Sequence, residues 1–319
     1  MSSDLPHLVF VVGPTACGKS DFAVEASVRS PALGKLQPEI INCDSIQFFE
    51  GVDIGAAKPS EELLARATHH LISHVAKGEK YNAGDFRRDA LTVIHERSLS
   101  GCQRFLAVGG SGFYIQALEK GMFDVPDIPE EIKEDLTKEL EGKGLEFLHR
   151  ELVRRDPDSG KRIQPADKYR ILRALEILRA DPENRTLSEI KEHFDRHREA
   201  PPFRVSKLGL FRQRDVLRER VIERTRNMLK NGLVNEVHAL RLEGLGSWNP
   251  MQSVGYAEVQ AMLDGDLPEE QLVDAIVTST MQLAKRQMTW FKKDASIQWF
   301  DVEAGLDGPL EAAKRLLDS

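Results

Sequence analysis

A glycine-rich segment near the start of the chain has the residue types and spacing that bind phosphate. It matches the pattern GxxxxGK[ST]. Glycines let backbone N–H groups curl around an anion, and the N-terminus of a following helix adds partial positive charge. The segment predicts a diphosphate, triphosphate or pyrophosphate ligand. Lys19 would supply a full positive charge, Ser20 a hydroxyl group for Mg²⁺, and Cys17 only a small side chain that fills space. The residues expected around the ligand are Gly13, Thr15, Ala16, Cys17, Gly18, Lys19 and Ser20.

A carboxylate is expected at the same site. Asp44 follows the apolar segment 39–43, whereas the later apolar segment 104–108 ends in Gly109-Gly110, without the acidic residue that orients Mg²⁺ in ordinary nucleoside triphosphatases. Ligands of parallel sheets lie at the carboxyl ends of the strands, so Asp44 is the carboxylate predicted closest to the loop. It is a candidate general base. It could instead cap a short helix over 45–48.

The elements that must position these residues predict an α/β fold. Apolar segments predict strands, and helical patterns between them require crossover connections and therefore a parallel sheet. We expect a P-loop NTPase-like core with a central parallel sheet, formed by residues 1–123 and 201–319, and an inserted all-helical domain over 124–200. Strands are predicted over 8–12, 39–43, 104–108, 207–211 and 297–300, and helices after residue 20 and over 61–67, 85–98, 215–242, 268–293 and 310–317.

Composition excludes several classes of protein. The chain has 319 residues, of which 41% are hydrophobic and 30% charged, which is enough apolar content for a folded core and excludes a disordered tail. No apolar run approaches the ~18 residues of a membrane span and no signal segment is apparent, so we expect a cytoplasmic protein without membrane contact. Three cysteines without a CxxC pair support neither a disulfide framework nor a zinc knuckle.

Seven motifs taken together resemble the tRNA dimethylallyltransferase family, also called tRNA isopentenyltransferases. The phosphate loop is shared by many families, whereas Asp-Ser-x-Gln, Asp-Ile-Gly-x-Ala-Lys-Pro and Ala-Lys-Arg-Gln-x-Thr-Trp in this order are specific to this one. The motifs are residues 13–20, Asp44 to Gln47, Asp53 to Pro59, Val108 to Tyr114, Arg173 to Glu176, Val254 to Tyr256 and Leu283 to Trp290.

The resemblance implies a prenyl transfer to RNA. A dimethylallyl group would pass from dimethylallyl diphosphate to N6 of the adenosine 3′ of the anticodon, with Mg²⁺, releasing diphosphate and giving N6-dimethylallyladenosine. Lys19, Mg²⁺ on Ser20 and, by family position, Arg224 would neutralise the leaving group. Asp44 would accept the proton from N6.

The partner implied is the anticodon stem-loop of tRNA, bound by a monomer, with the adenosine flipped out of its stack. Binding RNA requires positive charge, and two segments concentrate it. Residues 204–241 contain ten Lys and Arg against four Asp and Glu, and residues 150–173 contain eight Lys and Arg against four Asp and Glu. Both could instead be solvated helix faces. The residues expected at tRNA are Asp44, Ser45, Ile46, Gln47, Ser111, Gln164, Asp167, Arg173, Gln252, Gly255, Tyr256, Lys285 and Arg286.

Two alternatives belong to other classes. A small-molecule kinase would use the same loop with ATP, and Asp44 would be the base for a hydroxyl group. A non-catalytic, nucleotide-dependent RNA-binding module would tolerate the loss of Asp44. The absence of a lid-like arginine pattern and the presence of two basic segments argue against the kinase. A carboxylate at a strand end beside a complete loop argues against the module.

Overall fold

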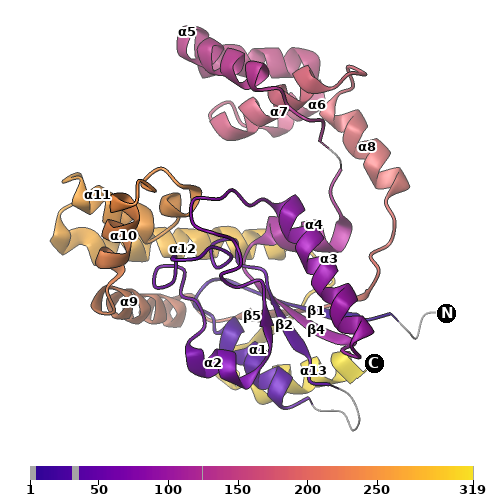
Figure 1. The fold of residues 1–319 in the computed structure, drawn as a ribbon, viewed down its shortest axis with the longest axis vertical. Helices are drawn as coiled ribbons and strands as arrows, with labels where there is room; N and C mark the ends of the chain where they lie inside the picture. The colour runs from indigo at the N-terminus through magenta and orange to yellow at the C-terminus, as the bar shows by residue number, and fades with distance from the viewer. Residues whose placement is uncertain (1–4, 31–35, 124, 319) are drawn as a thin grey trace. The chain divides into compact units, whose positions relative to one another are not determined.

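The chain divides into two compact units in a computed structural model that describes residues 5–30, 36–123 and 125–318. One unit comprises residues 1–119 and 201–319 and holds the sheet; the other comprises residues 120–200 and is helical (Figure 1). Asp124, where the helical insertion is expected to start, lies outside the described residues. None of the helices described is both long and apolar enough to cross a membrane.

A parallel sheet forms the centre of the first unit (Figure 1). In the described residues it has six strands in the order β3-β2-β4-β1-β5-β6, and every neighbouring pair is parallel. This confirms the predicted fold class. The two-residue strand β3 was not predicted, because two residues carry no periodicity. The strands are β1 (His7–Val12), β2 (Glu39–Asn42), β3 (His69–His70), β4 (Arg104–Gly109), β5 (Arg204–Phe211) and β6 (Gln298–Asp301).

Helices cover both faces of the sheet. All six residues of β1 are buried, and the five apolar residues from Leu8 to Val12 alternate between two hydrophobic cores. Leu8 and Phe10 pack with α3 (Ala83–Leu99) and α4 (Gly112–Lys120). Val9 and Val11 face the opposite side, where α1 (Lys19–Val28) and α13 (Asp307–Asp318) contribute to the core. Because successive strand residues point to opposite faces, a sheet covered on both sides requires the continuous apolar runs seen in the sequence.

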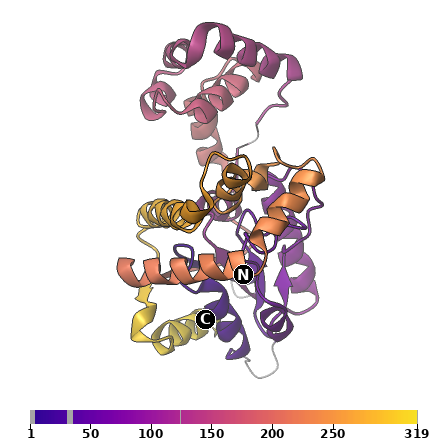
Figure 2. The ribbon, with the colours of Figure 1, turned by 90° about the vertical axis from the view of Figure 1, so that its left-hand side faces the viewer.

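The helices that follow β5 differ from the predicted pattern. The single helix expected over 215–242 is wrong: α9 (Arg214–Lys230) and α10 (Leu233–Leu242) are separated at Gly232, whose φ of +102° is one that residues with a Cβ rarely adopt. Helix α9 lies beside α12 (Leu272–Phe291) (Figures 1 and 2). Two further α-helices of this unit are short, α2 (Glu61–Arg66) and α11 (Tyr256–Leu263).

The helical unit has a hydrophobic core of its own. Leu136 and Leu148 of its first helix pack with Ile171 and Leu175 of its third, and all four side chains are buried. A unit that buries its apolar side chains internally can be inserted into another fold without depending on it for stability. Its helices are α5 (Glu130–Arg155), α6 (Pro157–Arg162), α7 (Lys168–Ala180) and α8 (Leu187–His197).

The first testable prediction concerns a buried histidine at the start of β1. His7 is 3% exposed, and burial together with the charge of Arg204 lowers its pKa from 6.5 to about 4. Between these values the unfolded chain binds a proton that the folded chain does not, so the contribution to stability is complete above pH 6.5 and is lost as the pH falls toward 4. We expect wild-type protein to lose about 1–2 kcal/mol more unfolding free energy than His7→Gln between pH 7 and pH 5.

The measurement is urea unfolding of both proteins at the two pH values, which also corrects for carboxylates that titrate in the same range. Equal losses in the two proteins would contradict the prediction.

Candidate active site

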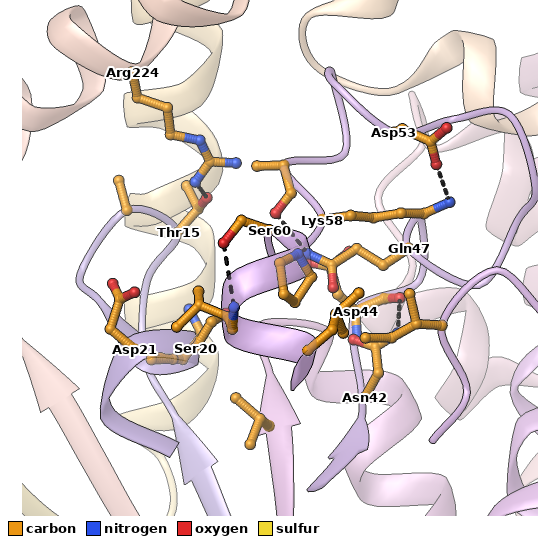
Figure 3. A pocket seen from close by; sticks show the side chains of 18 of the residues that line it. Thr15, Ser20, Asp21, Asn42, Asp44, Gln47, Asp53, Lys58, Ser60 and Arg224 are labelled. Atoms are coloured by element: carbon orange, nitrogen blue, oxygen red, sulfur yellow. Dashed lines mark hydrogen bonds and ion pairs between the residues drawn. The ribbon is translucent and has the colours of Figure 1, made fainter. Parts of the chain in front are cut away.

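A cavity of about 990 Å³ opens at the carboxyl ends of β1, β2 and β4 (Figure 3). Its walls come from segments that are far apart in the sequence but belong to the same unit. The phosphate loop, the end of β2 and one face of α9 line it, together with the segment 53–64. Carboxyl ends of adjacent parallel strands are where such sheets bind ligands. The cavity therefore contains both features that the sequence predicts, the loop and Asp44.

The phosphate loop links β1 directly to α1. A Cβ on Gly13 would lie 2.2 Å from the carbonyl oxygen of Leu210 in the adjacent strand, so only glycine allows this close approach. Ala16 has a φ of +64° and Gly18 one of +101°, and α1 begins immediately afterwards. Alternating backbone conformations of this kind, followed by a helix N-terminus, form an anion-binding concavity. The Lys19 ammonium donates to the Pro14 carbonyl at 2.7 Å, which holds its charge at the loop.

Three arginines, on α9 or just before it, contact the phosphate loop. Arg224 on α9 donates to the Thr15 hydroxyl at 3.3 Å, and Arg220 donates to the Ala16 carbonyl at 3.1 Å. Arg212, just before α9, donates to the Cys17 carbonyl at 3.2 Å. Burial lowers the pKa of the Arg224 guanidinium; the charge of Asp44 raises it, and that of Arg220 lowers it. Positive charge is thus concentrated at the phosphate-loop end of the cavity, and a bound anion would stabilise the charged form of Arg224.

Cys17 lies in the loop but turns its side chain away from any ligand. Its side chain is 1% exposed and belongs to the core that contains Val9 and Val11. Only its backbone could meet a diphosphate. The sequence-based interpretation of Cys17 as a filling residue agrees with this placement.

Asp44 lies just beyond β2, with one carboxylate oxygen held and the other open. Its Oδ1 accepts from the Ile46 backbone N–H at 3.1 Å, and the Asn42 side chain accepts from the Asp44 N–H at 3.0 Å. Residues 45–48 form turns rather than a helix, so the alternative of a helix cap is not borne out. In the part of the chain that the structure describes, Oδ2 has no protein partner. This geometry presents a fixed carboxylate oxygen that can accept a proton.

Ser111 lies against the residues after Asp44. Its hydroxyl accepts from the Ser45 backbone N–H and donates to the Ser45 hydroxyl, both at 3.1 Å. Gln47 lines the cavity, whereas Ile46 is partly buried against the core beneath it. The structure brings Ser45, Ile46, Gln47 and Ser111 into one region, and of these four only Gln47 lines the cavity. What each contacts in a substrate stays a prediction.

Gln287, which was not predicted as a site residue, connects two parts of the site. Its Oε1 accepts from the Thr15 backbone N–H at 2.7 Å, and its Nε2 donates to the Gly110 carbonyl at 3.2 Å. A Cβ on Gly110 would lie 2.3 Å from that same nitrogen, so a larger residue there would displace the Gln287 amide from this contact. Helix α12 thereby joins the phosphate loop to the end of β4.

The remaining residues predicted at tRNA do not line the cavity. Tyr256 is a correction: it is 0% exposed, so its side chain cannot touch RNA, and its hydroxyl donates instead to Glu236. Gly255 is buried as the residue before α11. Gln252, Lys285 and Arg286 are exposed on the surface of the same unit.

Three more predicted contacts belong to the helical unit. Gln164 is exposed, Asp167 caps α7 by accepting from the Arg170 backbone N–H, and Arg173 pairs with Glu176 at 2.8 Å. Asp167 and Arg173 thus have local structural partners already. Their role at RNA stays a prediction.

Sequence reasoning missed Arg212, Arg220 and Gln287. The two arginines lie in the basic segment 204–241, whose charge by itself predicts only an RNA-binding surface. Gln287 lies in the same motif as Lys285 and Arg286, directly after them. In each case the signal was present, but which helix face turns toward the loop depends on how α9 and α12 pack.

Comparison with known proteins gives consistent results. The family model described as IPP transferase matches residues 47–294. A tRNA dimethylallyltransferase of Bdellovibrio bacteriovorus is 41% identical over 94% of both chains, and one of Geobacter metallireducens is 40% identical over 95% of both. A crystal structure of the tRNA isopentenylpyrophosphate transferase from Bacillus halodurans superposes with a TM-score of 0.69 at 30% identity, covering 98% of this chain and 97% of that one.

The positive end of the cavity generates a second prediction. Replacing Arg224 by Gln removes a guanidinium that would donate a charge-assisted hydrogen bond to a bound pyrophosphate, so the affinity for inorganic pyrophosphate should fall about 10- to 100-fold. Isothermal titration calorimetry with Mg²⁺ present measures this. Arg218→Gln is the matched control, because Arg218 lies on the same helix with an exposed side chain that is not on the cavity wall. Equal affinities of the two variants would contradict the assignment.

Proposed function

Because the chain belongs to the IPP transferase family, we propose that it transfers a dimethylallyl group from dimethylallyl diphosphate to N6 of the adenosine 3′ of the anticodon in tRNA. The observation that carries this proposal is the position of Asp44 in one cavity with the phosphate loop and Arg224. A group that binds a leaving diphosphate and a group that accepts a proton are the two requirements of such a transfer.

The phosphate loop and its arginines bind the diphosphate end of the donor. In the reaction the C–O bond between the allyl carbon and the diphosphate breaks, and the electron pair leaves with the diphosphate. Lys19 and Arg224 stabilise the negative charge that develops there, and the backbone N–H groups of the loop add fixed dipoles. Positive charge held in place before the reaction favours the transition state because it needs no reorganisation.

Asp44 accepts the proton at the other end of the transfer. The adenine N6 forms a bond to the allyl carbon and loses one proton, which passes to the Asp44 Oδ2. The hydrogen bond from the Ile46 N–H orients the carboxylate through Oδ1 and leaves Oδ2 for this step. An exocyclic amine is a weak nucleophile, so a positioned base contributes about 10²- to 10⁴-fold.

Mg²⁺ fits the oxygen donors of the cavity. Ser20 and Asp21, at the start of α1, both line it. The described residues contain no group of three or more His, Cys, Asp or Glu side chains placed to hold a metal ion. Mg²⁺ is commonly held by one or two protein oxygens together with substrate phosphates and water, so Ser20 and the diphosphate would supply its ligands. When bound, the ion would neutralise charge on the diphosphate.

The RNA must deliver its base to a cavity that a stacked nucleotide cannot enter. The adenosine is therefore flipped out of the anticodon loop before reaction. Two groups of side chains are candidates for binding the anticodon stem-loop. One is the exposed set Gln252, Lys285 and Arg286, and the other comprises Gln164, Asp167 and Arg173 of the helical unit. Contacts to phosphate would make binding fall with increasing salt.

The direct test is incubation of the purified chain with Mg²⁺, unmodified tRNA and dimethylallyl diphosphate, followed by digestion and mass spectrometry. We expect adenosine to gain one C5H8 unit. A parallel reaction replaces the allyl donor by ATP. Consumption of ATP without prenylated adenosine would favour the kinase and overturn the proposal.

The third prediction concerns the proposed base. Asp44→Asn keeps the shape of the side chain and an oxygen for the Ile46 N–H, but it cannot take a proton at neutral pH. The turnover number should fall about 10²- to 10⁴-fold, while tRNA affinity stays within about threefold. Rapid-quench kinetics and filter binding measure the two quantities. Unchanged turnover, or a loss of tRNA binding in proportion to turnover, would remove Asp44 as the base.

A further inference from the structure

A single carboxylate holds one wall of the cavity from outside. Glu236, on α10, accepts backbone N–H groups from three consecutive residues: Asp53 at 3.0 Å and Ile54 at 2.8 Å through Oε2, and Gly55 at 3.1 Å through Oε1. These residues begin the loop 53–57, of which Asp53, Ile54 and Ala57 line the cavity. Hydrogen bonds to an ionised acceptor are about twice as strong as neutral ones. Glu236 thus determines the position of this loop.

Tyr256 reinforces the same contact. Its hydroxyl donates to the Glu236 Oε1 at 2.5 Å, and burial together with the charge of Glu236 raises its pKa, so it remains a donor. Its ring closes on the loop: a Cβ on Gly55 would lie 2.3 Å from the Tyr256 Cε2. The motifs Asp53 to Pro59 and Val254 to Tyr256 therefore meet at Glu236, a residue in neither of them.

The loop 53–57 also fixes the side chain of Gln47, which lines the cavity. The Gln47 Nε2 donates to the Ala56 and Ala57 carbonyls, each at 3.2 Å. Because its nitrogen faces these carbonyls, the Oε1 is the atom that the amide can offer to a ligand. Gln47 is 9% exposed and lines the cavity close along the chain to Asp44 (Figure 3). Lys58 fixes the end of the loop, donating to Phe49, Asp53 and Ser73 oxygens at 2.6 Å each.

We infer that Glu236 is a positioning residue that acts through the loop 53–57 to orient the Gln47 amide toward the base. An amide oxygen presented in this way accepts from an exocyclic amine such as the N6–H of adenine and rejects a purine with a carbonyl at that position. The inference rests on the proposed function for the identity of the base. It adds a residue that touches no substrate and yet controls which base is accepted.

The test uses Glu236→Gln in the full-length chain. The substitution keeps the volume but removes the charge and places an amide nitrogen where only acceptors fit. We expect kcat/KM for tRNA to fall about 10- to 100-fold. The Kd for inorganic pyrophosphate should stay within about twofold, because no contact of Glu236 reaches the phosphate loop. Glu243→Gln is the matched control: it lies just after the same helix, and its one ion-pair partner among the described residues is the exposed Lys77, so both values should equal wild type.

A second readout separates positioning from a general loss of structure. Two anticodon stem-loops are compared, one with adenosine and one with purine riboside at the target position, which differ only by the 6-amino group. Wild-type protein should bind the adenosine form about tenfold more tightly, and Glu236→Gln should lose most of that preference. Tyr256→Phe, which keeps the ring on Gly55 and three N–H donors on Glu236, should lose about twofold at most.

Two results would overturn the inference: an unchanged base preference in Glu236→Gln, or a parallel loss of pyrophosphate affinity. If Glu236→Gln does not fold, Gln47→Leu carries the same test and should lose the same preference. The binding comparison remains decisive even if wild-type protein transfers no prenyl group. Absence of transfer by the wild type would count against the proposed function, whereas the base preference tests the positioning by Glu236.

Discussion

The curled backbone of the phosphate loop is the constraint on which the rest of this structure depends. A backbone can curl around a diphosphate only where side chains are absent or turned away, and Gly13 and Gly18 supply those places. The curled loop must then be supported, since it has given up regular hydrogen bonding. Arg212, Arg220 and Arg224 bind its oxygen atoms, so the supporting side chains are themselves positively charged. In the proposed function, support of the loop and neutralisation of the diphosphate come from the same residues.

The two ends of the cavity are built by different means. The phosphate end uses strand-to-helix geometry and cations, which accept many phosphorylated ligands and explain why this loop alone does not specify a reaction. The other end uses short polar side chains held by backbone groups, as in the bonds of Asp44 to Ile46 and of Ser111 to Ser45. Fixed neutral dipoles and one carboxylate suit a base that must be oriented rather than merely attracted. Selectivity is therefore expected at this second end.

Contacts between residues far apart in the sequence fix the two ends of the cavity relative to each other. Gln287 of α12 joins the phosphate loop to Gly110, and Glu236 of α10 joins the loop 53–57 to the helices after the sheet. Both contacts link residues more than 170 positions apart in the sequence, and both end on backbone groups. A side chain that binds backbone fixes a whole segment rather than one neighbour. The late part of the chain thus acts as a frame for an active site whose chemistry resides mainly in the early part.

The sequence by itself determined the parallel α/β core, the phosphate loop and the carboxylate at the end of β2, because each depends on local order: apolar runs, glycine spacing and the end of a strand. It could not decide which faces of α9, α10 and α12 turn inward, since an arginine, glutamate or glutamine on a polar helix has the same local pattern whether it meets water or a distant loop. For this reason Arg220, Gln287 and Glu236 appeared only in the folded chain, and Tyr256 was wrongly expected at RNA. The break at Gly232 was missed for a related reason, because helical periodicity continues across it. Packing of the late helices, which depends on contacts between segments far apart in the chain, decided the second half of the site.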